Sequence, residues 1–437
     1  RPPRSTRGPD TTLFRASEAT LGEIFAWIIG WDLILEYAVG AVTVAISWSR
    51  YVVSFLHDLT LWFDHHHIAI NLDLPPVLTA ARGTPVTLAD GSIMLGPDGQ
   101  QVMGMFNLPA VIIVLVVTSL IVVGIRQSSL YNNIIVFVKI GVILLFVATA
   151  AFAINPANWH PFIPPNTSGK FGEFGWSGLM QGSGTLFFAY IGFDAVSTTA
   201  QESRNPQRDL PIGIIGSLIV CTILYIAVSV VATGVVPYTD LGGAAPIAHV
   251  ADVATAHSSS HLVRLLPKVI KLGAIAGLSS VIMVLLLGQT RIFWNMSKDG
   301  LLPGFVSAVH PRFKTPWITS IVTGVLVAFF SSTYTVGEMG NLCSIGTLLA
   351  FFIVCVSVLV LRVREPHHER KFRTPAIWFM APAGALSALW LMSYLPNAAW
   401  HRLIDWFLIG IVIYFTYSIR NSKLRTTVAT ETTSHGL

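Results

Sequence analysis

Ionisable side chains inside apolar segments are the residues of this chain that could do chemistry. Those within long apolar runs are Asp32, Glu36, Lys139, Asp194 and Arg291. A charged group in hydrocarbon costs roughly 2.5–3.5 kcal/mol on insertion scales, so such residues usually face a cavity or serve a function. Because desolvation penalises the charged form, buried carboxylates and a buried lysine can exchange charge with a proton. The chemistry that they indicate is proton exchange inside a membrane.

Two of these residues also have a simple structural explanation. Arg291 lies near the end of its apolar run, where a long side chain can reach the interface. Asp32 lies close to two tryptophans, which is typical of an interfacial or packing environment. We therefore assign function to the three residues in the middle of different runs, which are Glu36, Lys139 and Asp194.

Other candidate motifs carry weaker signals. Ser279 and Ser280 stand mid-run among small residues, where close helix packing is their expected role. The alternative is that a hydroxyl serves a coupling-ion site. The histidines at 65–67 lie in a polar loop with no obvious partner ligands, so no metal site is expected. The chain has no phosphate-binding loop, nucleophile elbow or zinc-ligand spacing, which argues against an enzyme and against a bound cofactor.

The stretch at 182–194, GSGTLFFAYIGFD, interrupts an apolar run that is long enough to cross a bilayer. Each of its glycines weakens a helix interior by roughly 1 kcal/mol relative to alanine. Together with Asp194 they predict a helix that opens near the membrane midplane, as in the substrate sites of secondary transporters. The alternative is a continuous helix whose small residues serve packing.

Composition places these segments in a membrane protein. Hydrophobic residues make up 53% and charged residues 11% of the chain, and mean hydropathy is +0.66. Soluble domains carry about 25% charged residues. At about 20 residues per crossing, the apolar runs predict an all-α polytopic protein with about ten spans. We expect the spans at 21–55, 108–123, 130–153, 176–200, 212–236, 269–294, 317–336, 341–361, 375–395 and 404–419.

Loop charges set the expected orientation. Basic residues gather on alternate loops, and these are Arg126, Arg204, Arg208, Lys298, Arg312, Lys314 and those at 362–373 and 420–425. By the positive-inside rule these loops are cytoplasmic, so we expect a multi-pass protein of the cell membrane with a cytoplasmic C-terminus. We expect a transporter domain at 17–420, between an unstructured segment at 1–16 and a polar tail at 421–437.

Several motifs resemble those of a known family. They are ATLGE at 19–23, IGWDLILEY at 29–37, FFAYIGFD at 187–194 and ESRNP at 202–206. They look like the cationic amino acid transporter branch of the amino acid–polyamine–organocation superfamily. The resemblance runs from about residue 17 to about residue 420.

This resemblance implies a fold and a site. Members have about twelve spans in a leucine-transporter-like inverted-repeat bundle, with spans one and six unwound at their centres. The stretch at 182–194 is similar to span six. The residues that would then bind substrate are Phe188, Ala189, Tyr190, Ile191 and Asp194. Glu36 matches a span-three glutamate near the site, and Lys139 matches the span-five lysine that replaces a sodium ion in proton-coupled members.

The implied function is an amino acid permease that transports cationic or small neutral amino acids by proton-coupled alternating access. Its expected partners are an amino acid, a proton and membrane lipid, with no nucleic acid. The chain departs from the family because only about three spans precede the broken one, where about five are expected. The first repeat therefore looks truncated. The alternative function is a non-transporting membrane protein or a remnant that binds a partner.

Overall fold

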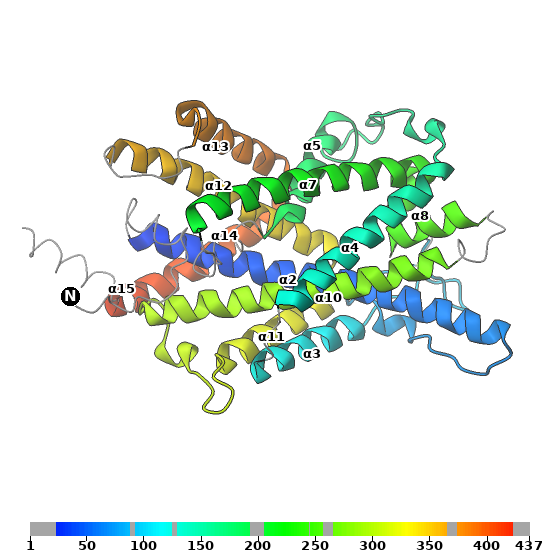
Figure 1. The fold of residues 1–437 in the computed structure, drawn as a ribbon, viewed down its shortest axis with the longest axis horizontal. Coiled ribbons are helices and arrows are strands. Elements are labelled where there is room, and N and C mark those ends of the chain that lie inside the picture. Colours follow the sequence, from blue (N-terminus) through cyan, green and yellow to red (C-terminus); the bar gives the residue numbers. More distant parts are fainter. Residues whose placement is uncertain are drawn as a thin grey trace, which may run out of the picture.

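The computed structural model describes residues 23–87, 92–124, 129–192, 205–243, 245–256, 265–364 and 374–422 (Figure 1). The predicted segment at 1–16, Asp194 and the tail after Ser422 lie outside these ranges. The longer helices are α2 (Glu23–His65), α3 (Leu108–Val123), α4 (Ser129–Ala150), α5 (Gly175–Thr185), α7 (Pro206–Val235), α8 (Pro246–Thr255), α10 (Leu266–Lys298), α11 (Trp317–Thr333), α12 (Val336–Arg364), α13 (Ile377–Tyr394) and α14 (Asn397–Ile413). Shorter turns include the 3₁₀ helix η4 (Leu186–Tyr190) and the π-helical turn η8 (Tyr414–Ser418).

The prediction of a helical, multi-pass membrane protein is confirmed. Seven of the described helices are long and apolar enough to cross a membrane, and these are α2, α4, α7, α10, α12, α13 and α14 with its continuation. Two shorter apolar helices, α3 and α11, coincide with the spans predicted at 108–123 and 317–336. Of the span predicted at 176–200, the structure describes residues up to Gly192, and within that part the α-helix ends at Thr185. The described chain therefore holds fewer full-length spans than the predicted ten.

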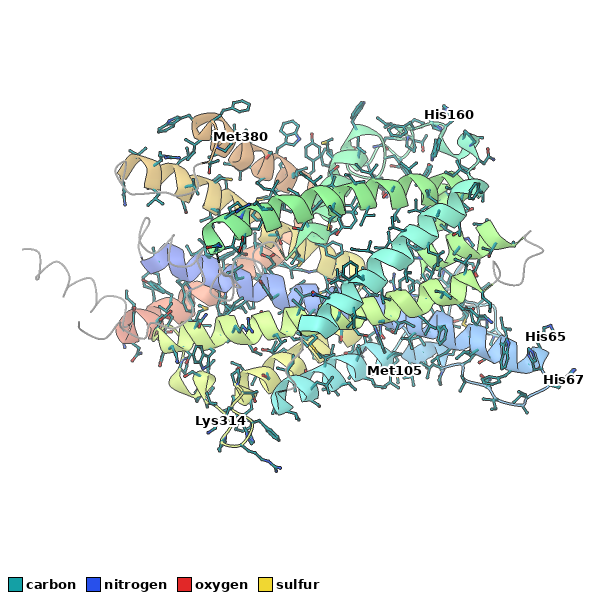
Figure 2. All side chains as sticks on the ribbon, viewed as in Figure 1. His65, His67, Met105, His160, Lys314 and Met380 are labelled. Carbon is teal, nitrogen blue, oxygen red and sulfur yellow. The ribbon has the colours of Figure 1, made fainter. Side chains whose placement is uncertain are left out.

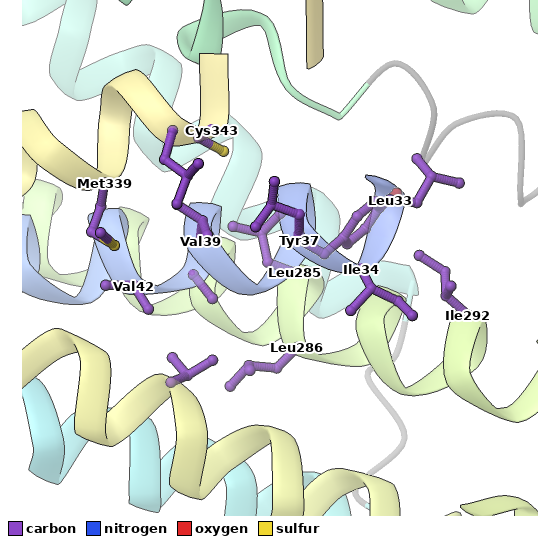
Figure 3. Packing of buried hydrophobic residues seen from close by; sticks show 14 of the residues in the cluster. Leu33, Ile34, Tyr37, Val39, Val42, Leu285, Leu286, Ile292, Met339 and Cys343 are labelled. Carbon is purple, nitrogen blue, oxygen red and sulfur yellow. The ribbon is translucent and has the colours of Figure 1, made fainter. Parts of the chain in front are cut away.

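Helix α2 is the centre of the bundle. It runs for 43 residues beside α10 along the long axis of the molecule (Figure 1). Figure 3 shows Tyr37 and Val39 of α2 among side chains of α10 and α12, including Leu285 and Cys343. The predicted end of this span at about residue 55 is wrong for the helix, which continues to His65. Apolar residues continue through this extension, and an ion pair near its end ties it to α10.

Reciprocal tryptophan contacts join α2 to α14. Trp31 donates its indole N–H to the carbonyl oxygen of Trp406 (2.8 Å), and Trp406 donates back to that of Trp31 (3.0 Å). Their rings stack with centroids 4.5 Å apart. Trp27 adds a bond to the carbonyl oxygen of Gly410 (3.1 Å). We call these four residues the tryptophan clasp. It holds the start of α2 beside the C-terminal half of α14.

An ion cluster at the opposite end joins α2, α8 and α10. The buried Lys271 places Nζ 2.5 Å from Oδ2 of Asp58 and 3.8 Å from Oδ2 of Asp252. We call these three residues the ion cluster. Its two carboxylates compensate a cation that would otherwise be costly to bury. Figure 2 shows His65 and His67 at this end of the molecule and Lys314, on a predicted cytoplasmic loop, toward the other.

The loop between α2 and α3 is folded back on itself. Isolated antiparallel bridges pair Pro85 with Met103 and Leu95 with Gln101. Gly96 donates its N–H to the carbonyl oxygen of Gln100 (2.8 Å). The described part of this loop is therefore an irregular hairpin. In the described part of the chain no group of three or more His, Cys, Asp or Glu residues is placed to hold a metal ion.

Candidate functional site

The predicted break in the helix at 182–194 is confirmed in its described part. Helix α5 ends at Thr185, and the chain tightens into η4. Ile191 is then extended (φ −60°, ψ 140°), and Gly192 has φ +117°, where side chains are strongly disfavoured. Gly184 has a packing role as well, because a Cβ there would lie 3.1 Å from the carbonyl oxygen of Leu391 in α13. Gly192 thus permits the break in the helix, whereas Gly184 permits close packing against α13.

Helix α12 holds the broken segment through two polar side chains. Ser344 donates its hydroxyl to the carbonyl oxygen of Thr185 (2.7 Å) and accepts the N–H of Phe188 (3.1 Å). Thr185 in turn donates its hydroxyl to the side-chain oxygen of Asn341 (2.7 Å). A helix end leaves main-chain groups without intrahelical partners, and Ser344 satisfies two of them at the junction of α5 and η4. The break is therefore a defined conformation held by a neighbouring helix.

Helix α7 contacts the same segment. Tyr225 donates its hydroxyl to the carbonyl oxygen of Ala189 (2.8 Å). The hydroxyls of Tyr190 and Thr222 lie 3.2 Å apart, and the Tyr190 and Tyr225 rings meet edge to face at 5.4 Å. Phe188 and Ile191 pack against the main apolar core. The predicted substrate residues 188–191 thus lie together in η4 and its end, whereas Asp194 lies outside the described residues.

Glu36 lies in the buried centre of α2, with 3% of its surface exposed. The thiol of Cys343 in α12 donates to its carbonyl oxygen (3.3 Å). Cys343 directly precedes Ser344, which holds η4. One turn of α12 therefore contacts both the helix that carries Glu36 and the broken segment. That Glu36 takes part in the substrate site stays a prediction.

Lys139 lies at a different contact, between α4 and α10. Its ammonium group donates to the hydroxyl of Ser280 (2.5 Å), and that hydroxyl donates to the carbonyl oxygen of Gly277 (2.9 Å). A Cβ at Gly277 would lie 3.4 Å from Cε of Lys139, so the glycine leaves room for the lysine stem. Ser279 instead accepts the indole N–H of Trp48 (2.8 Å). Ser279 therefore joins α10 to α2, and Ser280 is the partner of Lys139. A coupling-ion role for either hydroxyl stays a prediction.

Three polar residues, two beside the broken segment and one in the ion cluster, were missed at the sequence level. Asn341 and Ser344 stand three residues apart in a strongly apolar segment, so they share one face of α12. That spacing was the available signal. Lys271 was missed because it stands at the edge of its apolar run, where a lysine normally reaches the interface. The structure instead buries it against Asp58.

Known proteins resemble this chain along most of its length. The sequence matches the amino acid permease family over residues 10–417. It is 40% identical to the branched-chain amino acid permease BcaP of Bacillus subtilis (strain 168) over 94% of this chain and 80% of that protein. The methylthioribose transporter of the same organism is 37% identical over the same shares. The vacuolar cationic amino acid transporter 2 of Arabidopsis thaliana is 35% identical over 84% of this chain and 52% of that protein.

A match over 408 of 437 residues covers nearly every described helix, including the broken segment and both helices that hold it. The resemblance is therefore to the whole bundle rather than to one motif. The chain belongs to the amino acid permease family, and it is a multi-pass membrane transporter rather than an enzyme.

Proposed function

We propose that this permease carries neutral, branched-chain amino acids across the cell membrane by secondary active transport, with its C-terminus in the cytoplasm. The observation that carries this proposal is the interrupted segment at 185–192, because a helix opened inside a membrane exposes main-chain groups to a polar ligand. The transporter domain at 17–420 then forms a leucine-transporter-like inverted-repeat bundle. Residues 188–191, Glu36 and Asp194 take part in binding the substrate.

The surroundings of η4 favour an apolar substrate side chain. Phe187, Phe188 and Ile191 all pack against the main apolar core, and Phe187 meets Phe351 edge to face at 5.5 Å. The branched-chain permease of Bacillus subtilis, a relative at 40% identity, supports the same substrate class. The cationic branch suggested by the sequence motifs is the competing proposal, and the plant relative named for cationic amino acids supports it.

Proton coupling through Lys139 is the second part of the proposal. The lysine is half-buried in an apolar helix and has a hydroxyl partner on α10. A cation held between α4 and α10 can tie the two helices together, and its deprotonation would release them. Lys139 would then link the protonation state of the carrier to its conformation.

Reconstitution in proteoliposomes tests both parts. Labelled leucine should enter vesicles loaded with unlabelled isoleucine or valine, and a pH gradient that is acidic outside should drive its accumulation. Excess arginine should compete poorly. If arginine competes as well as isoleucine, the cationic assignment is correct. If methylthioribose is exchanged and no amino acid is, the proposed substrate class is wrong.

A further inference from the structure

Asp32 is a carboxylic acid in the interior of the bundle, and none of the described residues is a polar partner of its carboxyl group. Its exposed fraction is 0%. Within the part of the chain that the structure describes, neither Oδ1 nor Oδ2 has a hydrogen-bond partner, although buried polar atoms in proteins nearly always have one. A Cβ at Gly346 of α12 would lie 3.1 Å from Oδ1 of Asp32. The carboxyl group therefore packs directly against the backbone of α12, in space that the glycine leaves open.

The ionisable groups around Asp32 do not supply a counter-charge. On α2 the nearest is Glu36, one helical turn away and also buried. On α12 the thiol of Cys343 donates to the backbone of Glu36. Arg291 of α10 and Asp405 of α14 are exposed. Among the described residues no cation pairs with Asp32, and a second buried acid on the same face adds repulsion if both ionise.

An ionised carboxylate in such a place would be left without solvation, so the neutral acid is the form that this conformation accommodates. A neutral acid with no hydrogen bond is still less favourable than an apolar residue of similar size. An aspartate at position 32 is explained if another conformation of the carrier exposes the carboxyl group to water and lets it ionise. Asp32 lies on the clasp end of α2, next to Trp31, which places it toward the predicted cytoplasmic side.

We propose that Asp32 is a proton-binding site of the carrier, distinct from Lys139. This inference rests on the proposed transport function. In the conformation described here Asp32 holds a proton. When the cytoplasmic side opens, its O–H bond breaks, the proton passes to an entering water molecule, and the electron pair stays on the carboxylate. Return to the closed bundle requires a proton to be taken up again, which couples the conformational cycle to proton movement.

The first test compares two transport modes in Asp32→Asn, which mimics the neutral acid permanently. The readout is the ratio of pH-gradient-driven accumulation to leucine counterflow, which needs no net proton movement. We expect this ratio to fall by about tenfold or more, as if one coupling step were removed. Asp405→Asn, the change of an exposed aspartate on α14, should leave the ratio at the wild-type value. An unchanged ratio in Asp32→Asn overturns the proposal, as does wild-type protein that exchanges leucine without responding to the gradient.

A second measurement does not depend on transport. Infrared spectra of the purified wild-type protein at neutral pH should contain the carbonyl stretch of a protonated carboxyl group. The difference spectrum of wild type minus Asp32→Asn, or minus Asp32→Ser if the asparagine variant does not fold, should contain that band as a positive peak. If the difference spectra lack this peak, Asp32 does not hold the proton. Failure of every tested amino acid to exchange would instead refute the transport proposal and leave the infrared result to decide on Asp32.

Discussion

Removing the hydroxyl of Ser344 should loosen the broken segment and weaken substrate binding. In Ser344→Ala, the carbonyl oxygen of Thr185 and the N–H of Phe188 lose the partner that now lies 2.7 and 3.1 Å away. Leaving a buried main-chain group unpaired costs about 1–3 kcal/mol, while hydrogen bonds between membrane helices average only about 0.6 kcal/mol. Because both groups are only half-buried, we take the lower part of this range and expect about 2 kcal/mol in total.

That energy should appear as a loss of affinity. The apparent dissociation constant rises as the competent conformation becomes less populated, and about 2 kcal/mol corresponds to roughly 30-fold. Equilibrium binding of labelled leucine to purified protein measures the change. Ser357→Ala is the matched control, because among the described residues the partner of the Ser357 hydroxyl lies within α12 itself, at the carbonyl oxygen of Ile353 (2.8 Å). Ser344→Thr keeps the hydroxyl and should recover part of the affinity.

The reasoning fails if Ser344→Ala binds leucine as tightly as Ser357→Ala does. It also fails if the thermal unfolding temperature drops while affinity is unchanged, because Ser344 would then contribute to packing rather than to the geometry of the break.

The remaining predictions concern Lys139 and the ion cluster. Lys139→Ala should insert normally but lose gradient-driven accumulation, measured in proteoliposomes; normal accumulation would refute its coupling role. Asp58→Asn should lower the free energy of unfolding by about 2 kcal/mol, because Lys271 loses the carboxylate that lies 2.5 Å away. Removing one member of a fully buried pair costs about 3–5 kcal/mol, and the partial exposure of Asp58 reduces that cost. Asp252 is half-exposed and lies 3.8 Å from Lys271, so Asp252→Asn should lower the free energy of unfolding less or not at all. Equal melting temperatures for Asp58→Asn and Asp252→Asn would contradict this ranking. Burial raises the pKa of Asp252, with Lys271 opposing, so the stability contributed by its protonated form is complete at low pH and is lost as pH rises through the raised pKa. Asp252→Asn should remove that step from a plot of melting temperature against pH.

The helices were predictable because hydropathy over about 20 residues identifies a crossing without any knowledge of neighbours. The break at 185–192 was also predictable, since glycine has the same backbone freedom in any context. The predicted end of the first span was wrong because the extension to His65 is held by Lys271, a residue more than 200 positions away in the sequence.

Pairings between helices could not be predicted from one sequence. Lys139 and Ser280 were each singled out, but periodicity gives the face of a helix and not its neighbour. The partners of Ser344 could not be predicted for the same reason, because they depend on α5 ending opposite α12. The lack of a partner for Asp32 is likewise a property of the packed bundle, and tryptophans nearby in the sequence had suggested an ordinary interfacial residue.

The tryptophan clasp has a consequence for biogenesis. Its two halves are separated by about 375 residues, so the start of α2 emerges from the ribosome long before α14 exists. During that interval the indole N–H groups of Trp27 and Trp31 lack the α14 carbonyl oxygens that they bind in the folded bundle. A nascent chain stopped before residue 397 therefore lacks these contacts at the start of α2. The clasp can close only after α14 has been made.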